Sequence, residues 1–146
     1  MTKDELTRRE AEAWAAFEEL VGRVPEERLE TPALAGGWSV KDVLWHVAYW
    51  WGEFVRSAER NWADDEQATD DVNAREQARS RAMPFVEVRA EVDEARARLL
   101  EAWSRVDGSD AAGLEAFSAE TVEHYEDHVP QLRALVEDPG VKARGV

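Results

Sequence analysis

A chain of 146 residues is long enough to fold as one domain around an apolar core and short for two. Its formal net charge of -14, from 32 Asp and Glu residues against 18 Lys and Arg residues, would repel phosphate backbones, and no basic stripe offsets it, so we expect no nucleic-acid partner. The sequence has no cysteine, which excludes disulfides, thiolate metal ligands and a cysteine nucleophile.

The N-terminal residues MTKDELTRREAEAW are charged throughout and contain no apolar signal-peptide core. No later apolar run reaches membrane-spanning length. We therefore expect a soluble, cytoplasmic protein without a membrane partner.

The first predicted helix follows Thr2, which can form a T-x-x-E capping box with Glu5, and it ends before Pro25. Its apolar residues recur at helical spacing. They are Leu6, Ala13, Phe17, Leu20, Val21 and Val24.

The second predicted helix begins after Ser39, a good N-cap residue with Asp42 at the third helical position. Its apolar stripe comprises Val40, Val43, Leu44, Val47, Trp51, Phe54 and Val55. His46 lies about 60° beyond one edge of that stripe, which places it at a seam between helices. Trp45 and Tyr49 project from the far side, where another element must cover them.

Residues 59–83 are too polar for a core element and predict a long crossover, in which residues 71–81 can form a surface helix. Pro84 is a favoured first residue for the third core helix. The apolar residues of that helix keep a near-heptad spacing as far as Val106, which favours nearly parallel packing of neighbouring helices. A fourth helix should then end near Asp138, because Pro and Gly follow.

These elements predict an all-α protein, a four-helix bundle with one long crossover between helices 2 and 3. The connections between helices 1 and 2 and between helices 3 and 4 are short. We expect residues 1–138 to form this single domain and residues 139–146 to be a disordered or frayed tail.

Two of the three histidines, His124 and His128, lie four residues apart in the fourth helix, within roughly 40° of each other on one face. Residues that favour burial share that face, namely Phe117, Thr121, Leu132 and Leu135. Both imidazoles should therefore point inward. Hydrogen-bonded core residues and metal ligands are both consistent with this spacing. His46 can join the pair if the second and fourth helices are neighbours.

Two segments carry a family resemblance. GGWSVKDVLWHVAYW resembles the helix 2 motif of the DinB/YfiT-like superfamily, a G-W-S-x-x-[DE]-x-[LI]-x-H pattern, and TVEHYEDHVPQLRAL resembles its C-terminal H-x-x-x-H helix. The similarity covers nearly the whole chain. It implies a four-helix bundle in which the matching residues His46, His124 and His128 bind one divalent metal ion, and it implies a homodimer, since dimers are common in the superfamily.

Three neutral imidazoles would leave such an ion an open position, as in catalytic sites, and zinc, nickel, iron(II) and copper all suit this donor set. One hypothesis is metal-hydroxide hydrolysis of a small molecule. A second follows from the resemblance, because some relatives are thiol-dependent S-transferases or isomerases: the metal activates a low-molecular-weight thiol. That thiol must be external, since the chain has no cysteine. The third is a non-enzymatic metal-binding or stress-response protein.

Two further expectations concern the surroundings of these residues. Metal-ligating histidines usually donate their other N–H to a carboxylate or a carbonyl. The candidate carboxylates are Glu120, Asp127 and Asp42. The aromatic pair Trp45 and Tyr49 favours a twofold homodimer through the second helix, because residues 63–71 of the crossover are highly charged and offer little apolar cover.

Overall fold

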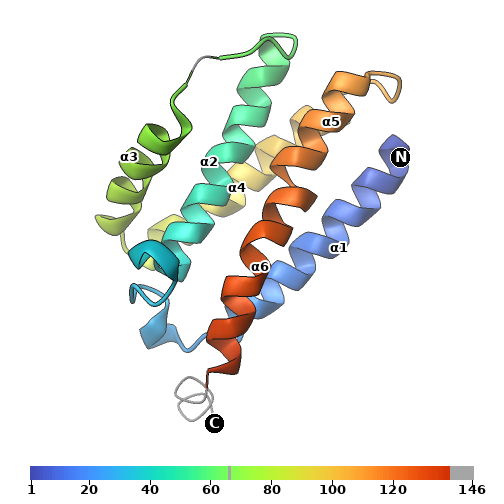
Figure 1. Ribbon diagram of the computed structural model, residues 1–146. Coiled ribbons are helices and arrows are strands. Elements are labelled where there is room, and N and C mark those ends of the chain that lie inside the picture. Colours follow the sequence, from blue (N-terminus) through green and yellow to red (C-terminus); the bar gives the residue numbers. More distant parts are fainter. Residues whose placement is uncertain (66, 139–146) are drawn as a thin grey trace.

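The computed structural model describes residues 1–65 and 67–138, and helices are the only regular secondary structure within them (Figure 1). The expected tail at residues 139–146 lies outside the described residues. The helices are α1 (Lys3–Gly22), α2 (Val40–Glu59), α3 (Thr69–Arg81), α4 (Phe85–Ser104), α5 (Ala111–Glu120) and α6 (Val122–Glu137). Two short 3-10 turns, Glu26–Arg28 and Ala35–Gly37, lie between α1 and α2.

The capping box predicted at Thr2 is present at the start of α1, and the predicted N-cap residue Ser39 forms a second capping box at the start of α2. The hydroxyl groups of Thr2 and Ser39 accept hydrogen bonds from the backbone N–H groups of Glu5 and Asp42, whose carboxylates accept from the N–H groups of the caps. These reciprocal bonds satisfy N–H groups that a helix start leaves without partners. The start of α4 differs slightly from the expectation, because Pro84 is its N-cap rather than its first helical residue.

The helices α1, α2 and α4, with α5 and α6 as the fourth member, form the predicted four-helix bundle (Figure 1). The crossover helix α3 runs antiparallel to α2, since Ser80 contacts Asp42 near the start of α2 while Asn73 contacts Trp50 further along it. The chain then continues into α4, which lies beside α2 and runs in the same direction as α2. The helix α2 therefore lies between α6 on one side and α3 and α4 on the other.

The crossover covers the two aromatic residues that the sequence analysis assigned to a dimer interface. Trp45 Nε1 donates to Glu76 Oε1 at 3.2 Å, and the Tyr49 hydroxyl donates to Gln67 Oε1 at 3.2 Å. Both aromatic side chains are half-buried. The expectation that the crossover leaves them uncovered was wrong, because its polar residues pair with the polar atoms of the rings instead of supplying apolar surface.

The fourth helix of the bundle is broken, which the sequence analysis did not predict. Thr121, between α5 and α6, has φ -121° and ψ -94°, far from helical values. Its side chain is fully buried, and its hydroxyl donates to the carbonyl of Phe117 at 2.6 Å. The break lies three residues before His124, so the axis of α6, which carries both histidines, need not continue the axis of α5.

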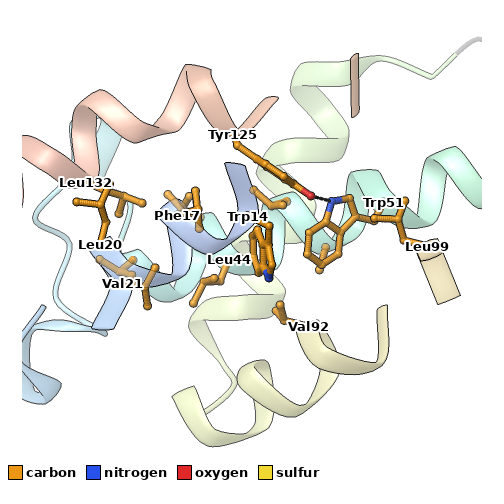
Figure 2. Packing of buried hydrophobic residues seen from close by; sticks show 14 of the residues in the cluster. Trp14, Phe17, Leu20, Val21, Leu44, Trp51, Val92, Leu99, Tyr125 and Leu132 are labelled. Carbon is orange, nitrogen blue, oxygen red and sulfur yellow. Dashed lines mark hydrogen bonds between the residues drawn. The ribbon is translucent and has the colours of Figure 1, made fainter. Parts of the chain in front are cut away.

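Aromatic side chains fill the centre of the bundle (Figure 2). The ring centroid of Trp14 lies 5.1 Å from that of Phe17, 4.8 Å from that of Trp51 and 5.2 Å from that of Tyr125. Such offset and tilted contacts stabilise a core beyond the area that they bury. Three of the four rings are fully buried, which gives α1, α2 and α6 one shared core.

A buried polar network crosses this core and joins all four bundle helices. Glu10 of α1 is 1% exposed and binds the Arg96 guanidinium of α4 with two hydrogen bonds of 2.6 and 2.7 Å. The Tyr125 hydroxyl of α6 donates to Glu10 at 2.6 Å and accepts from Trp51 Nε1 of α2 at 2.9 Å (Figure 2). Because Tyr125 directly follows His124, this network fixes the rotation of the helix that carries the histidine pair.

Candidate metal centre

The structure brings the three histidines together from two helices. His46 lies in the second turn of α2, and His124 and His128 lie one turn apart in α6. One nitrogen from each ring can be chosen so that all three atoms lie within 4.8 Å of one another. The Nε2 atoms of His46 and His124 are 2.8 Å apart. The second and fourth bundle helices are therefore neighbours, as the convergence of the histidines requires.

The geometry of these side chains fits one divalent ion. With metal–nitrogen distances of about 2.0–2.1 Å, the ligand nitrogens of a tetrahedral site lie roughly 3.3 Å apart. This value lies between the 2.8 Å that separates the Nε2 atoms of His46 and His124 and the 4.8 Å within which all three candidate ligand atoms lie. The Nδ1 atoms of His124 and His128 are buried and have no hydrogen-bond partner within the described part of the chain. The Nδ1 atom of His124 lies on the other side of the ring from the Nε2 atom that meets His46, so an ion held through Nε2 would leave this Nδ1 without a partner.

Burial keeps the imidazoles neutral. It lowers the pKa of His46 to about 4, aided by the charge of His128, and it lowers the pKa of His124 to about 3, aided by both other histidines. Burial also lowers the pKa of His128, against the opposing effect of Asp127. At pH 7 each ring therefore offers a lone pair, which is the form that metal binding requires.

A pocket of about 230 Å³ opens beside two of the three histidines. His46 and His128 line it together with Trp38, Asn73 and Gln131. The Trp38 ring stands edge-on to the His46 ring, with centroids 5.2 Å apart and an interplanar angle of 89°. The pocket gives a small molecule a way to the histidines, with one aromatic wall and two amide side chains for hydrogen bonds.

The Gly36-Gly37 pair places Trp38 in this wall. Both glycines have left-handed backbone angles, with φ of 74° and 77°, a region that side chains with a Cβ rarely adopt. A Cβ at Gly36 would also lie 3.3 Å from the Trp38 ring. The two glycines thus allow the tight turn that leads from the connector into α2 and brings the indole against His46.

The carboxylates that the sequence analysis proposed as partners of the imidazoles do not bond them. The Asp42 carboxylate accepts from the Ser80 hydroxyl and from the Ser39 backbone N–H. The Nδ1 atoms of His124 and His128 have no partner among the described residues, so the proposed acidic residues of α5 and α6 do not reach them. That expectation was wrong, because helix capping already uses the buried carboxylate of α2.

An amide takes the place of the expected carboxylate at His46. Asn73 of α3 lines the same pocket as His46, and the proximity of its side chain acts to raise the pKa of His46 against the larger effect of burial. The Asn73 Oδ1 atom also accepts from Trp50 Nε1 at 3.0 Å. Asn73 was not predicted as part of the site, because the polarity of the crossover indicated a solvated surface. Gln131 was not predicted either, although it follows His128 by three residues.

The fold and this cluster define the class of the protein: a helical bundle in which histidines from two helices can hold a metal ion. No helix among the described residues is long and apolar enough to cross a membrane.

The family model described as the mycothiol maleylpyruvate isomerase N-terminal domain matches residues 11–114, so the chain belongs to that family, which is part of the DinB/YfiT-like superfamily of helical metal-binding proteins. The matched segment contains His46 and ends before His124 and His128. No curated protein and no solved structure matches the chain significantly.

Proposed function

We propose that the protein binds one divalent metal ion, Zn, Ni or Fe, through His46, His124 and His128, and that it transfers a low-molecular-weight thiol to a small-molecule electrophile. The observation that carries this proposal is the convergence of three neutral imidazoles beside an open pocket. The family is named after a mycothiol maleylpyruvate isomerase, which favours a thiol as the co-substrate.

A divalent ion held by three neutral imidazoles keeps its full charge, and it would lower the pKa of a thiol that binds it. The chain supplies the remaining requirements. Burial keeps each imidazole neutral, so that one nitrogen of each ring has a free lone pair, and Asn73 orients the His46 ring. Gln131 offers an amide to a polar group of the substrate, while Trp38 shields one side of the pocket from water. Because the sequence has no cysteine, the nucleophilic sulfur comes from the co-substrate.

Elemental analysis of protein purified without a His-tag tests the metal site. We expect about one equivalent of a divalent metal in the wild type and a loss of that metal in His124→Ala. Arg133→Ala, which changes an exposed residue of the same helix, is the matched control and should keep the metal. Circular dichroism should show an unchanged helix content in all three proteins, because the apolar stripes remain. Full metal content in His124→Ala would refute the assignment.

Turnover assays with a panel of thiols, including mycothiol, and of electrophiles, including maleylpyruvate, test the reaction. We expect product only with both a thiol and the metal, and none with His124→Ala. Metal-dependent turnover without any thiol would favour the alternative of a hydrolase. A protein that binds metal but converts no substrate in the panel would favour the non-enzymatic metal-binding or stress-response alternative.

Two proposals concern the chain as a whole. Residues 1–138 form a single domain, and the protein is a homodimer. The first is consistent with one shared core, and the second rests on the resemblance to the superfamily.

A further inference from the structure

A second pocket, of about 280 Å³, lies on the side of α2 away from His46, between α2 and α4. Part of its wall is aliphatic and comes from Ala48, Val55 and Ala95. The rings of Trp45 and Tyr49, which α3 covers only in part, form another side. The pocket therefore offers flat apolar surface to a small molecule, at a place that the proposed metal chemistry does not use.

Arg56, which lines this pocket, has a guanidinium group with one unpaired donor. Its Nε atom donates to Glu53 at 3.0 Å, and its guanidinium carbon lies 5.1 Å from the centre of the Tyr49 ring. Its Nη2 atom, in contrast, is buried and has no hydrogen-bond partner among the described residues. A buried donor on a cation strongly favours an acceptor. The guanidinium thus has one edge fixed by the protein and one donor for which the described residues offer no acceptor.

Gly52 keeps room for this arrangement. A Cβ at this position would lie 3.1 Å from Arg56 Nη1, closer than ordinary contact. Glycine in the middle of a helix is less favourable than alanine, yet Gly52 lies well inside α2. Its missing side chain leaves space for the guanidinium at the wall of the pocket.

The charges around the pocket favour an anion on balance. Arg98 also lines it, and its ion pair with Glu94 is long, at 3.8 Å, and solvent-exposed. Glu91 is the acidic residue that lines it, and its side chain is exposed, so water screens its repulsion. The Arg56 side chain is itself 43% exposed, but its buried Nη2 atom keeps one donor out of contact with water.

We propose that this pocket binds a small planar carboxylate, with its ring between the aromatic and aliphatic walls and its carboxylate on Arg56. A cavity of roughly 150 Å³ can hold benzene, so the observed volume has space for one ring and a carboxylate. A neutral apolar molecule would leave Arg56 Nη2 unpaired, and an inorganic anion would leave the rings of Trp45 and Tyr49 unused. The proposal does not depend on the metal centre.

Calorimetric titration with benzoate tests the proposal, with His124→Ala as the background so that the carboxylate has no metal to bind. We expect saturable binding of one benzoate per chain. Arg56→Gln should weaken it at least tenfold, and Ala95→Leu, which fills the pocket without a change of charge, should do the same. Arg8→Gln removes an exposed arginine of α1 and should leave the affinity unchanged. Circular dichroism confirms that each variant is folded.

Three results would overturn the proposal. The first is an absence of saturable binding to the background protein. The second is equal affinity of Arg56→Gln and Arg8→Gln for benzoate. The third is binding of acetate or benzamide as tight as that of benzoate, because acetate lacks the ring and benzamide lacks the negative charge.

Discussion

Glu120 ends α5 beside the helix break, and its carboxyl group is largely shielded from water. Burial, and secondly the charge of Glu53, raises its pKa from 4.5 to about 7. The folded state therefore holds this proton more tightly than the unfolded state does. The resulting stabilisation is fully present below pH 4.5 and is lost as the pH rises to about 7.

Glu120→Gln should remove this pH dependence, because glutamine has a similar shape and does not ionise. We expect the variant to match the wild type near pH 4 and to exceed its free energy of unfolding at pH 8 by on the order of 2 kcal/mol. Urea unfolding of both proteins at the two pH values measures the difference. A difference that is the same at pH 4 and pH 8 would contradict the raised pKa.

Tyr125→Phe tests the buried network. The substitution removes a hydroxyl that donates to Glu10 and accepts from Trp51, so it leaves the indole N–H without its acceptor. We expect a loss of about 1–3 kcal/mol in the free energy of unfolding, measured with urea. The matched control is Tyr49→Phe, whose half-buried hydroxyl bonds Gln67 at 3.2 Å, and it should lose less. Equal losses would show that the network adds no stability of its own.

The sequence contained a signal for two members of this network. Glu10 lies four residues after Leu6 and three before Ala13, in the middle of the apolar stripe of α1, and Tyr125 lies on the histidine face of α6. A charged residue on a buried stripe requires a partner. The partner itself could not be predicted, because Arg96 is 86 residues away in the sequence and meets Glu10 only through the packing of α1 against α4.

At the scale of the elements, α6 begins at a break shortly before its histidine pair and has a proline shortly after it. Thr121 breaks the helix before His124, and Pro130 lies inside α6, two residues after His128. Proline lacks the N–H that an interior helical position would use, so it weakens the ladder at that turn. The helix that carries both histidines therefore starts independently of α5 and can take its direction from its contacts with α1 and α2.

Thr121→Val tests what holds the break together. Valine keeps the shape of threonine but leaves the buried carbonyl of Phe117 without the hydroxyl that now donates to it at 2.6 Å. We expect a loss of about 1–2 kcal/mol in the free energy of unfolding. Thr31→Val removes a similar bond of 3.3 Å to Glu27 near the surface and should change the stability little. If both variants lose the same amount, the buried hydroxyl has no special role at the break.

The sequence predicted the existence and order of the bundle helices well, because capping boxes and long apolar stripes are local signals. The capping boxes at Thr2 and Ser39 gave the starts of α1 and α2 correctly. The break at Thr121 left no such signal, since threonine is common inside helices and the apolar stripe continues through it. The cover that α3 gives to Trp45 was missed because it depends on hydrogen bonds between side chains of two helices.

At the scale of the whole molecule, the three histidines were predicted as a group, although their convergence depends on which helices are neighbours. The periodicity of α2 placed His46 at the edge of a stripe and did not say which helix packs there. The long crossover decides this: α3 and α4 occupy one side of α2, which leaves the other to α5 and α6. The family motif around His46 indicated the site where the helical pattern alone did not.

The homodimer is the last prediction, and the structure changes its argument. Because α3 covers Trp45 and Tyr49, the aromatic patch no longer supports an interface through α2, and the prediction rests on the superfamily. Light scattering at micromolar concentration should give twice the 16.6 kDa mass of the chain. Trp45→Glu should keep that mass and lower the stability, since the new carboxylate would face Glu76, whose side chain is 4% exposed. A monomer mass for the wild type would contradict the homodimer, whereas a monomeric Trp45→Glu beside a dimeric wild type would restore the interface through α2.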